Sequence, residues 1–168
     1  MRIVHWIGCL TFVASATLCS AADTETPPLL GAGNTLMIQA APGAYHFSNG
    51  SEHKGTQWLV GAELQFPSHW LGGYSYFNNS FDQKSHYFYG GYWWQISDKY
   101  PSWYFKLTGG LIYGYKEPYE DKVPLNHNGY SPGIIPAIGY KFDRFNVQLI
   151  PFGTAGLMAT FGYDLVRW

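Results

Sequence analysis

The chain ends in an amphipathic segment, residues 161–168, whose last residue is the aromatic Trp168. An aromatic residue at the end of a closing strand places a ring at a membrane interface, where its apolar body meets lipid and its edge meets headgroups. An N-terminal segment typical of a secretory signal stands at the other end of the chain. Together the two ends predict an outer-membrane β-barrel.

The predicted signal has three parts: Arg2, an apolar run over residues 7–18, and the small residues Ser20, Ala21 and Ala22. The apolar run is shorter than the roughly 20 residues that a spanning helix needs. We therefore expect cleavage after Ala21 rather than a membrane anchor. We predict a signal peptide over 1–21, a periplasmic segment over 22–34 and a barrel over 35–168.

Length and composition fit this class. Cleavage after Ala21 leaves the 147 residues from Ala22 to Trp168, enough for eight tilted strands of roughly 9 to 11 residues with their connections. Aromatic residues make up 19% of the chain and charged residues 12%, a mixture typical of a barrel with aromatic girdles. Both cysteines fall in the predicted signal, so we expect no disulfide. The near-neutral charge gives no sign of a nucleic-acid partner, and we expect a monomer.

Apolar and polar residues alternate along the predicted strands, which places lipid-compatible side chains outward and polar ones inward. Lys106 is predicted to face inward, because a lysine on the lipid face costs roughly 2–4 kcal/mol at the bilayer midplane. Asp164 has the parity of Trp168, so the closing strand needs a bulge or an early end. The eight strands are predicted over residues 36–47, 56–66, 70–79, 85–96, 103–115, 133–142, 145–150 and 155–167.

Pro42 lies within the first predicted strand, Pro136 lies at the start of the sixth, and Pro151 closes the seventh. Each proline removes a donor from the ladder of hydrogen bonds, and water cannot replace that bond inside a bilayer. We interpret these positions as lateral openings for a lipid chain. The alternative is that they only mark bulges near the rim.

His46 and Ser80 both lie at predicted outer ends of strands, where an imidazole can take the proton of a hydroxyl that attacks an ester. The same spacing also arises by coincidence in a chain with six histidines. The remaining histidines lack the spacing of metal ligands, so we expect no metal site.

Five motifs, in their order and spacing, resemble the lipid A palmitoyltransferases: AYHF at 44–47, YFNNSFDQ at 76–83, GGYWW at 90–94, PGIIPAIGY at 132–140 and LIPFGT at 149–154. The resemblance implies an eight-stranded barrel in the outer membrane of a Gram-negative cell. It also implies transfer of a palmitoyl chain from a phospholipid to lipid A. By this resemblance His46 and Ser80 are the rim residues, Gly91 floors the acyl pocket, and Pro42 and Pro136 mark lateral gates.

The sequence departs from the family at two places. The family has an aspartate before its serine, where this chain has Asn79, which forms hydrogen bonds but carries no charge. The family also has an amphipathic helix before the first strand, whereas prolines and glycines break helical periodicity over residues 23–34.

Two functions remain open. In the first, an acyltransferase uses His46 as general base, Ser80 as nucleophile or orienting hydroxyl, and Asn79 or Asp82 as orienter. The donor is a phospholipid, the acceptor is lipopolysaccharide, and no cofactor is needed. Lys84 and Lys116, with Lys54 and Lys122, then contact lipid phosphates or merely solvate the surface. In the second, the barrel is non-catalytic and binds lipid or stabilises the envelope. A transport channel is least favoured, because eight strands leave room inside only for side chains or one small ligand.

Overall fold

A computed structural model describes residues 33–47, 56–152 and 156–168. The predicted signal peptide, nearly all of the segment 22–34 and Lys54 lie outside these residues. The described elements, in chain order, are β1 (Thr35–Ala41), β2 (Ala44–His46), β3 (Trp58–Gln65), β4 (Trp70–Asn78), β5 (Lys84–Gln95), β6 (Trp103–Tyr113), the 3₁₀ helix η1 (Glu120–Lys122), β7 (Tyr130–Phe142), β8 (Phe145–Pro151) and β9 (Gly156–Arg167).

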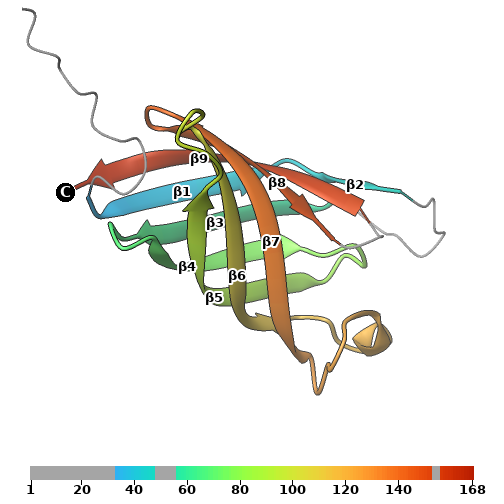
Figure 1. Cartoon of the computed structure of the whole chain (residues 1–168). Helices are drawn as coiled ribbons and strands as arrows, with labels where there is room; N and C mark the ends of the chain where they lie inside the picture. Colours follow the sequence, from blue (N-terminus) through green and yellow to red (C-terminus); the bar gives the residue numbers. More distant parts are fainter. Residues whose placement is uncertain (1–32, 48–55, 153–155) are drawn as a thin grey trace, which may run out of the picture.

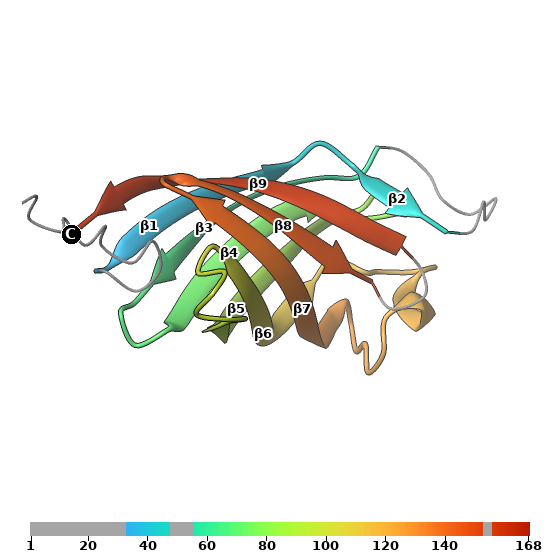
Figure 2. The same cartoon turned by 45° about the horizontal axis from the view of Figure 1, so that its top comes forward.

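The strands form a closed antiparallel barrel, because β1 pairs with β3 on one side and with β9 on the other. Eight strands close the barrel, and the short β2 adds to the end of β9 beyond β1 (Figures 1 and 2). The predicted fold class is confirmed. The prediction of one continuous first strand over 36–47 is wrong, because Pro42 and Gly43 divide it into β1 and β2.

The two ends of the barrel differ. The C-terminus and the short turns lie at one end, which we call the turn end, and β2 and η1 lie at the other, which we call the loop end (Figure 1). In the described parts of the chain, no helix has the length and apolarity that a membrane crossing requires.

Strand alternation places polar side chains inside and apolar ones outside. In β3, Glu63 and Gln65 are buried in the interior, whereas Val60 is 48% exposed on the outer surface. Lys106 faces inward as predicted, and its Nζ lies 2.9 Å from Glu63 Oε2. This alternation is the pattern of a barrel in a bilayer, with water-compatible groups sheltered from lipid.

The closing strand contains the bulge that the parity of Asp164 required. Leu36 pairs with Val166 and the next residue, Met37, pairs with Asp164, so Leu165 is the extra residue. The bulge lets Asp164 point inward, where it is fully buried and 2.8 Å from Lys141 Nζ. The Asp164 carboxylate therefore forms an ion pair inside the barrel instead of facing outward.

Two predicted strand bounds are wrong at the loop end. β6 stops at Tyr113 rather than at residue 115, because Gly114 has φ +135° and turns the chain. β7 begins at Tyr130 rather than at residue 133 and runs through Pro132 and Pro136. The strand tolerates these prolines because this stretch pairs with β6 alone, while pairing with β8 starts only at residue 138.

Candidate active site

His46 and Ser80 come together at the loop end of the barrel. His46 is the last residue of β2, and Ser80 follows the end of β4 by two residues. The distance between His46 Nε2 and Ser80 Oγ is 2.9 Å, and both residues are half-buried. An imidazole at hydrogen-bond distance from a hydroxyl has the geometry of a base and its nucleophile.

Asn79 shapes the turn that presents Ser80. Its Oδ1 accepts hydrogen bonds from the backbone N–H groups of Phe81 at 2.9 Å and Gln83 at 3.0 Å. Its Nδ2 donates to Ser85 Oγ at 3.1 Å, and the residue is only 3% exposed. The amide is thus used in holding the turn. The predicted role of Asn79 as orienter therefore takes a different form, since these bonds act on the backbone around Ser80.

Asp82, the other predicted orienter, lies on the exposed side of the same turn. Its Oδ1 accepts a hydrogen bond from Asn78 Nδ2 at 2.7 Å, and Asn78 Oδ1 in turn accepts one from Lys84 Nζ at 2.9 Å. The structure therefore links Asp82 to Lys84 at the rim through Asn78. Its backbone has φ +62°, a left-handed conformation that aspartate tolerates in turns.

Two of the predicted rim lysines, Lys84 and Lys116, lie against aromatic rings. Lys84 Nζ lies 5.1 Å from the centre of the Trp58 ring, and Lys116 Nζ lies 4.9 Å from that of Tyr113. Contact with Tyr113 also raises the pKa of Lys116 above its ordinary value. Both ammonium groups lie at the loop end, close to where the strands end.

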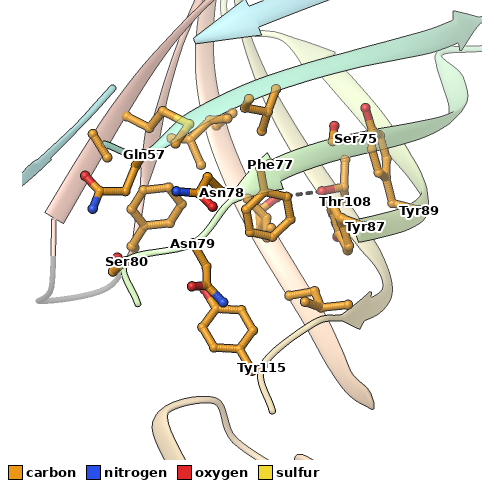
Figure 3. A pocket seen from close by; sticks show the side chains of 18 of the residues that line it. Gln57, Ser75, Phe77, Asn78, Asn79, Ser80, Tyr87, Tyr89, Thr108 and Tyr115 are labelled. Carbon is orange, nitrogen blue, oxygen red and sulfur yellow. Dashed lines mark hydrogen bonds between the residues drawn. The ribbon is translucent and has the colours of Figure 1, made fainter. Parts of the chain in front are cut away.

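A cavity of about 380 Å³ opens beneath the His46 and Ser80 pair. Figure 3 shows Ser80 and Gln57 toward one side of it and Ser75, Tyr89 and Thr108 toward the other. The side walls are mainly apolar, with Leu59, Phe77, Ile112, Ile135, Ile150 and Met158. A mainly apolar cavity with a small number of precisely placed polar groups is the usual form of a small-molecule binding site.

Polar side chains close the cavity on the side toward the turn end. Lys106 and Tyr89 line it there and both bond to Glu63 Oε2, at 2.9 Å and 3.1 Å. Gln39 donates to the Tyr89 hydroxyl at 3.1 Å. These side chains satisfy one another, so they form a fixed floor.

Gly91 lies outside the cavity lining. It shares the inward face of β5 with Tyr89, one step closer to the turn end. Tyr89 and Lys106 line the cavity and Gly91 does not, so the floor is set by tyrosine and lysine side chains. Sequence spacing could not show how far a tyrosine side chain reaches across the interior.

Tyr115 lines the cavity, although the alternation in the sequence placed it with Tyr113 on the lipid face. The positive φ of Gly114 reverses the parity of the residues that follow. Burial raises the pKa of Tyr115 to about 12, so its hydroxyl stays protonated near neutral pH. A glycine directly before the residue was the only sequence signal of this change.

The ladder of hydrogen bonds is interrupted at Pro42. Pairing of β1 with β3 ends at Ala41 and Leu59, and among the described strands β2, beyond Pro42, pairs only with β9. Ala44 and Leu59, on either side of this break, both line the cavity.

A second interruption separates β7 from β8. Their pairing ends at Ile138 and Leu149, so Pro136 and Pro151 stand beyond the last pair. Ala137 and Ile150 flank this break and line the cavity. The predicted prolines therefore mark real gaps in the ladder, and residues beside both gaps line the cavity.

No protein-family model matches the chain, and no curated protein matches its sequence. Among the described residues, no group of three or more histidine, cysteine, aspartate or glutamate side chains is arranged to hold a metal ion. An eight-stranded barrel with this outer surface is compatible with an outer-membrane barrel.

Proposed function

We propose that the protein is an outer-membrane acyltransferase that resembles the lipid A palmitoyltransferases. It moves a palmitoyl chain from a phospholipid to lipid A at the loop end of the barrel. The observation that carries the proposal is the 2.9 Å contact of His46 Nε2 with Ser80 Oγ at the mouth of the apolar-walled cavity.

The outer surface supports placement in a bilayer. Exposed aliphatic side chains such as Ile134 and Leu111 cover the strand walls, at 77% and 46% exposure. Exposed aromatic residues stand near the strand ends, where interfacial girdles of outer-membrane barrels lie. Those toward the turn end include Trp70, Trp94, Trp103 and Phe145, and those toward the loop end include Tyr45, Phe47 and Tyr130.

The reaction begins with the donor chain in the cavity and its ester at the mouth. Ser80 Oγ attacks the ester carbonyl carbon while His46 Nε2 takes the hydroxyl proton. The bond from that carbon to the glycerol oxygen breaks, and Nε2 returns the proton to this oxygen. The acyl chain is then on Ser80 and a lysophospholipid leaves.

The second half of the reaction repeats these steps in the opposite direction. A hydroxyl group of lipid A attacks the carbonyl carbon of the acylated serine while His46 takes its proton. The bond to Ser80 Oγ breaks, and the proton returns to that oxygen. In the alternative order, the lipid A hydroxyl attacks the phospholipid ester directly and Ser80 only orients the imidazole; a trapped acyl-serine distinguishes the two.

The gaps beside Pro42 and Pro136 give lipid chains a lateral route into the cavity, and Lys84 and Lys116 contact headgroup phosphates. The site needs no metal or cofactor for this chemistry.

The second function is a non-catalytic barrel that binds lipid. Asn79 favours this function, because its amide bonds to the backbone of its own turn and carries no charge that could stabilise an imidazolium.

The proposal is tested with purified protein in mixed micelles of lipid A and a phospholipid whose palmitoyl chain is labelled. We expect Ser80→Ala and His46→Ala to lower label transfer by about 10²-fold to 10⁴-fold, the usual contribution of acid–base catalysis. Exposed Ser68→Ala and His127→Ala are the matched controls and should transfer at the wild-type rate. Equal transfer by all four folded variants would remove the assignment of the site.

A further inference from the structure

The turn that carries Ser80 is held by the connection between β6 and β7, residues 114–129. Phe81, directly after Ser80, stacks on Tyr119 of this connection with ring centres 4.3 Å apart and planes at 17°. Tyr115 contacts the same phenylalanine edge-on, with ring centres 6.3 Å apart. Phe81 is thus held between two rings that belong to a different part of the chain.

A second contact reaches the far side of the turn. Gln83 Oε1 accepts a hydrogen bond from the backbone N–H of Lys116 at 3.1 Å, and Gln83 Nε2 donates to the carbonyl of Lys116 at 3.1 Å. A side-chain amide bonded to both backbone groups of one residue fixes distance and orientation together. The Ser80 turn is therefore attached to the β6–β7 connection at two places.

The β6–β7 connection is itself braced. Asn126 Nδ2 donates to the carbonyl of Tyr115 at 2.8 Å, and Asn126 Oδ1 accepts from the N–H of Gly129 at 3.0 Å. Ser131 Oγ, at the start of β7, donates to the carbonyl of Pro124 at 2.6 Å. The rings of Tyr115 and Tyr119, which contact Phe81, therefore belong to a segment that is stabilised by its own hydrogen bonds.

The bonds of Asn79 and the contacts of Tyr119 serve different purposes. Asn79 bonds within its own turn and to Ser85, so it fixes the shape of the turn. His46, however, belongs to β2, which pairs with β9. The distance from Ser80 to His46 thus depends on how the whole turn is held, and the Phe81 and Tyr119 stack is the contact next to Ser80.

We propose that Tyr119 is a positioning residue, whose ring acts through Phe81 to set the distance between Ser80 Oγ and His46 Nε2. The inference rests on the proposed function and extends it to a residue outside the cavity lining. A displacement of about 1 Å at a reacting group lowers the rate by about 10²-fold, so a turn released from its support has a measurable effect.

The test compares Tyr119→Leu with Tyr119→Phe, and with Leu125→Ala as a control in the same connection, where Leu125 is 81% exposed. We expect Tyr119→Leu to lower kcat for acyl transfer by at least about tenfold and to leave KM within about twofold. Tyr119→Phe keeps the stacked ring and should match the wild type, as should Leu125→Ala. A wild-type kcat in folded Tyr119→Leu would overturn the proposal.

A second readout separates this proposal from the proposed function. The imidazole of His46 is titrated by NMR in wild type, Ser80→Ala and Tyr119→Leu. Loss of the Ser80 contact shifts the titration midpoint, and Tyr119→Leu should shift it in the same direction, whereas Tyr119→Phe should not. An unchanged midpoint in Tyr119→Leu refutes positioning. Absence of acyl transfer by the wild type refutes the proposed function, while the titration still decides the role of Tyr119.

Discussion

The two ends of the barrel use the same strands in opposite ways. Toward the turn end, the strands are paired on both sides, and two buried ion pairs, Glu63 with Lys106 and Lys141 with Asp164, fill the interior. Toward the loop end, pairing stops beside Pro42 and Pro136, and the interior holds an apolar-walled cavity. The two ends therefore differ both in strand pairing and in what occupies the interior.

The difference teaches where this small fold places its stability. A buried ion pair that is also hydrogen-bonded resists change, because removal of one partner leaves a charge without compensation. Unpaired backbone in a bilayer is costly unless it lines a cavity or is otherwise satisfied. We therefore expect the turn end to supply the rigid base and the loop end to have the lower local stability that is typical of binding sites.

The largest effect on stability is expected from Lys106→Met, which removes the cation of the buried ion pair with Glu63. The variant leaves the Glu63 carboxylate buried without its cation, so the free energy of unfolding should fall by about 3–5 kcal/mol. The measurement is urea unfolding in detergent micelles. The double variant Glu63→Gln with Lys106→Met should recover most of the loss. A stability equal to wild type in Lys106→Met would show that the turn end does not carry the stability of the barrel.

A smaller effect is expected at the cavity. Ala137 is 2% exposed and lines the cavity beside the β7 and β8 gap, so Ala137→Phe fills space that a lipid chain would occupy. We expect acyl transfer to fall about tenfold, equivalent to roughly 1.4 kcal/mol of binding. Unfolding in urea should change little. If Ala137→Phe instead unfolds readily and still transfers at the wild-type rate, the cavity belongs to the rigid base.

The smallest effect is expected from Asn79→Asp. An aspartate oxygen still accepts the N–H groups of Phe81 and Gln83, and the Ser85 hydroxyl can donate in place of accepting. The free energy of unfolding should change by no more than about 1 kcal/mol, the scale of one hydrogen bond. The transfer rate should stay within about threefold. A rise of tenfold or more would show that charge at residue 79 acts on His46 and that the turn role is secondary.

Much of the barrel could be predicted from alternation. The inward position of Lys106 and the bulge after Asp164 both follow from the cost of a charge facing lipid, which strand parity exposes directly. The first strand was harder, because Pro42 was recognised as a break but the chain resumes pairing at residue 44, where β9 is its only partner in the described part of the chain. Parity shows which face a residue occupies, whereas the partner strand depends on long-range packing.

The site was predictable in its residues and less so in its contacts. The order of motifs brought out His46 and Ser80, which the structure places 2.9 Å apart. The turn bonds of Asn79 and the stack of Phe81 on Tyr119 depend on loop conformation, which no periodic pattern encodes. Gly91 shows the same limit, because the Tyr89 side chain rather than the backbone sets the depth of the cavity.

The most direct test of acyl transfer is a mass spectrum of lipid A from a Gram-negative host that lacks its own palmitoyltransferase and expresses this protein. A gain of one palmitoyl unit, lost in folded Ser80→Ala and His46→Ala, is the predicted result. An unchanged spectrum from a folded barrel in the outer membrane would contradict the account and favour the non-catalytic function.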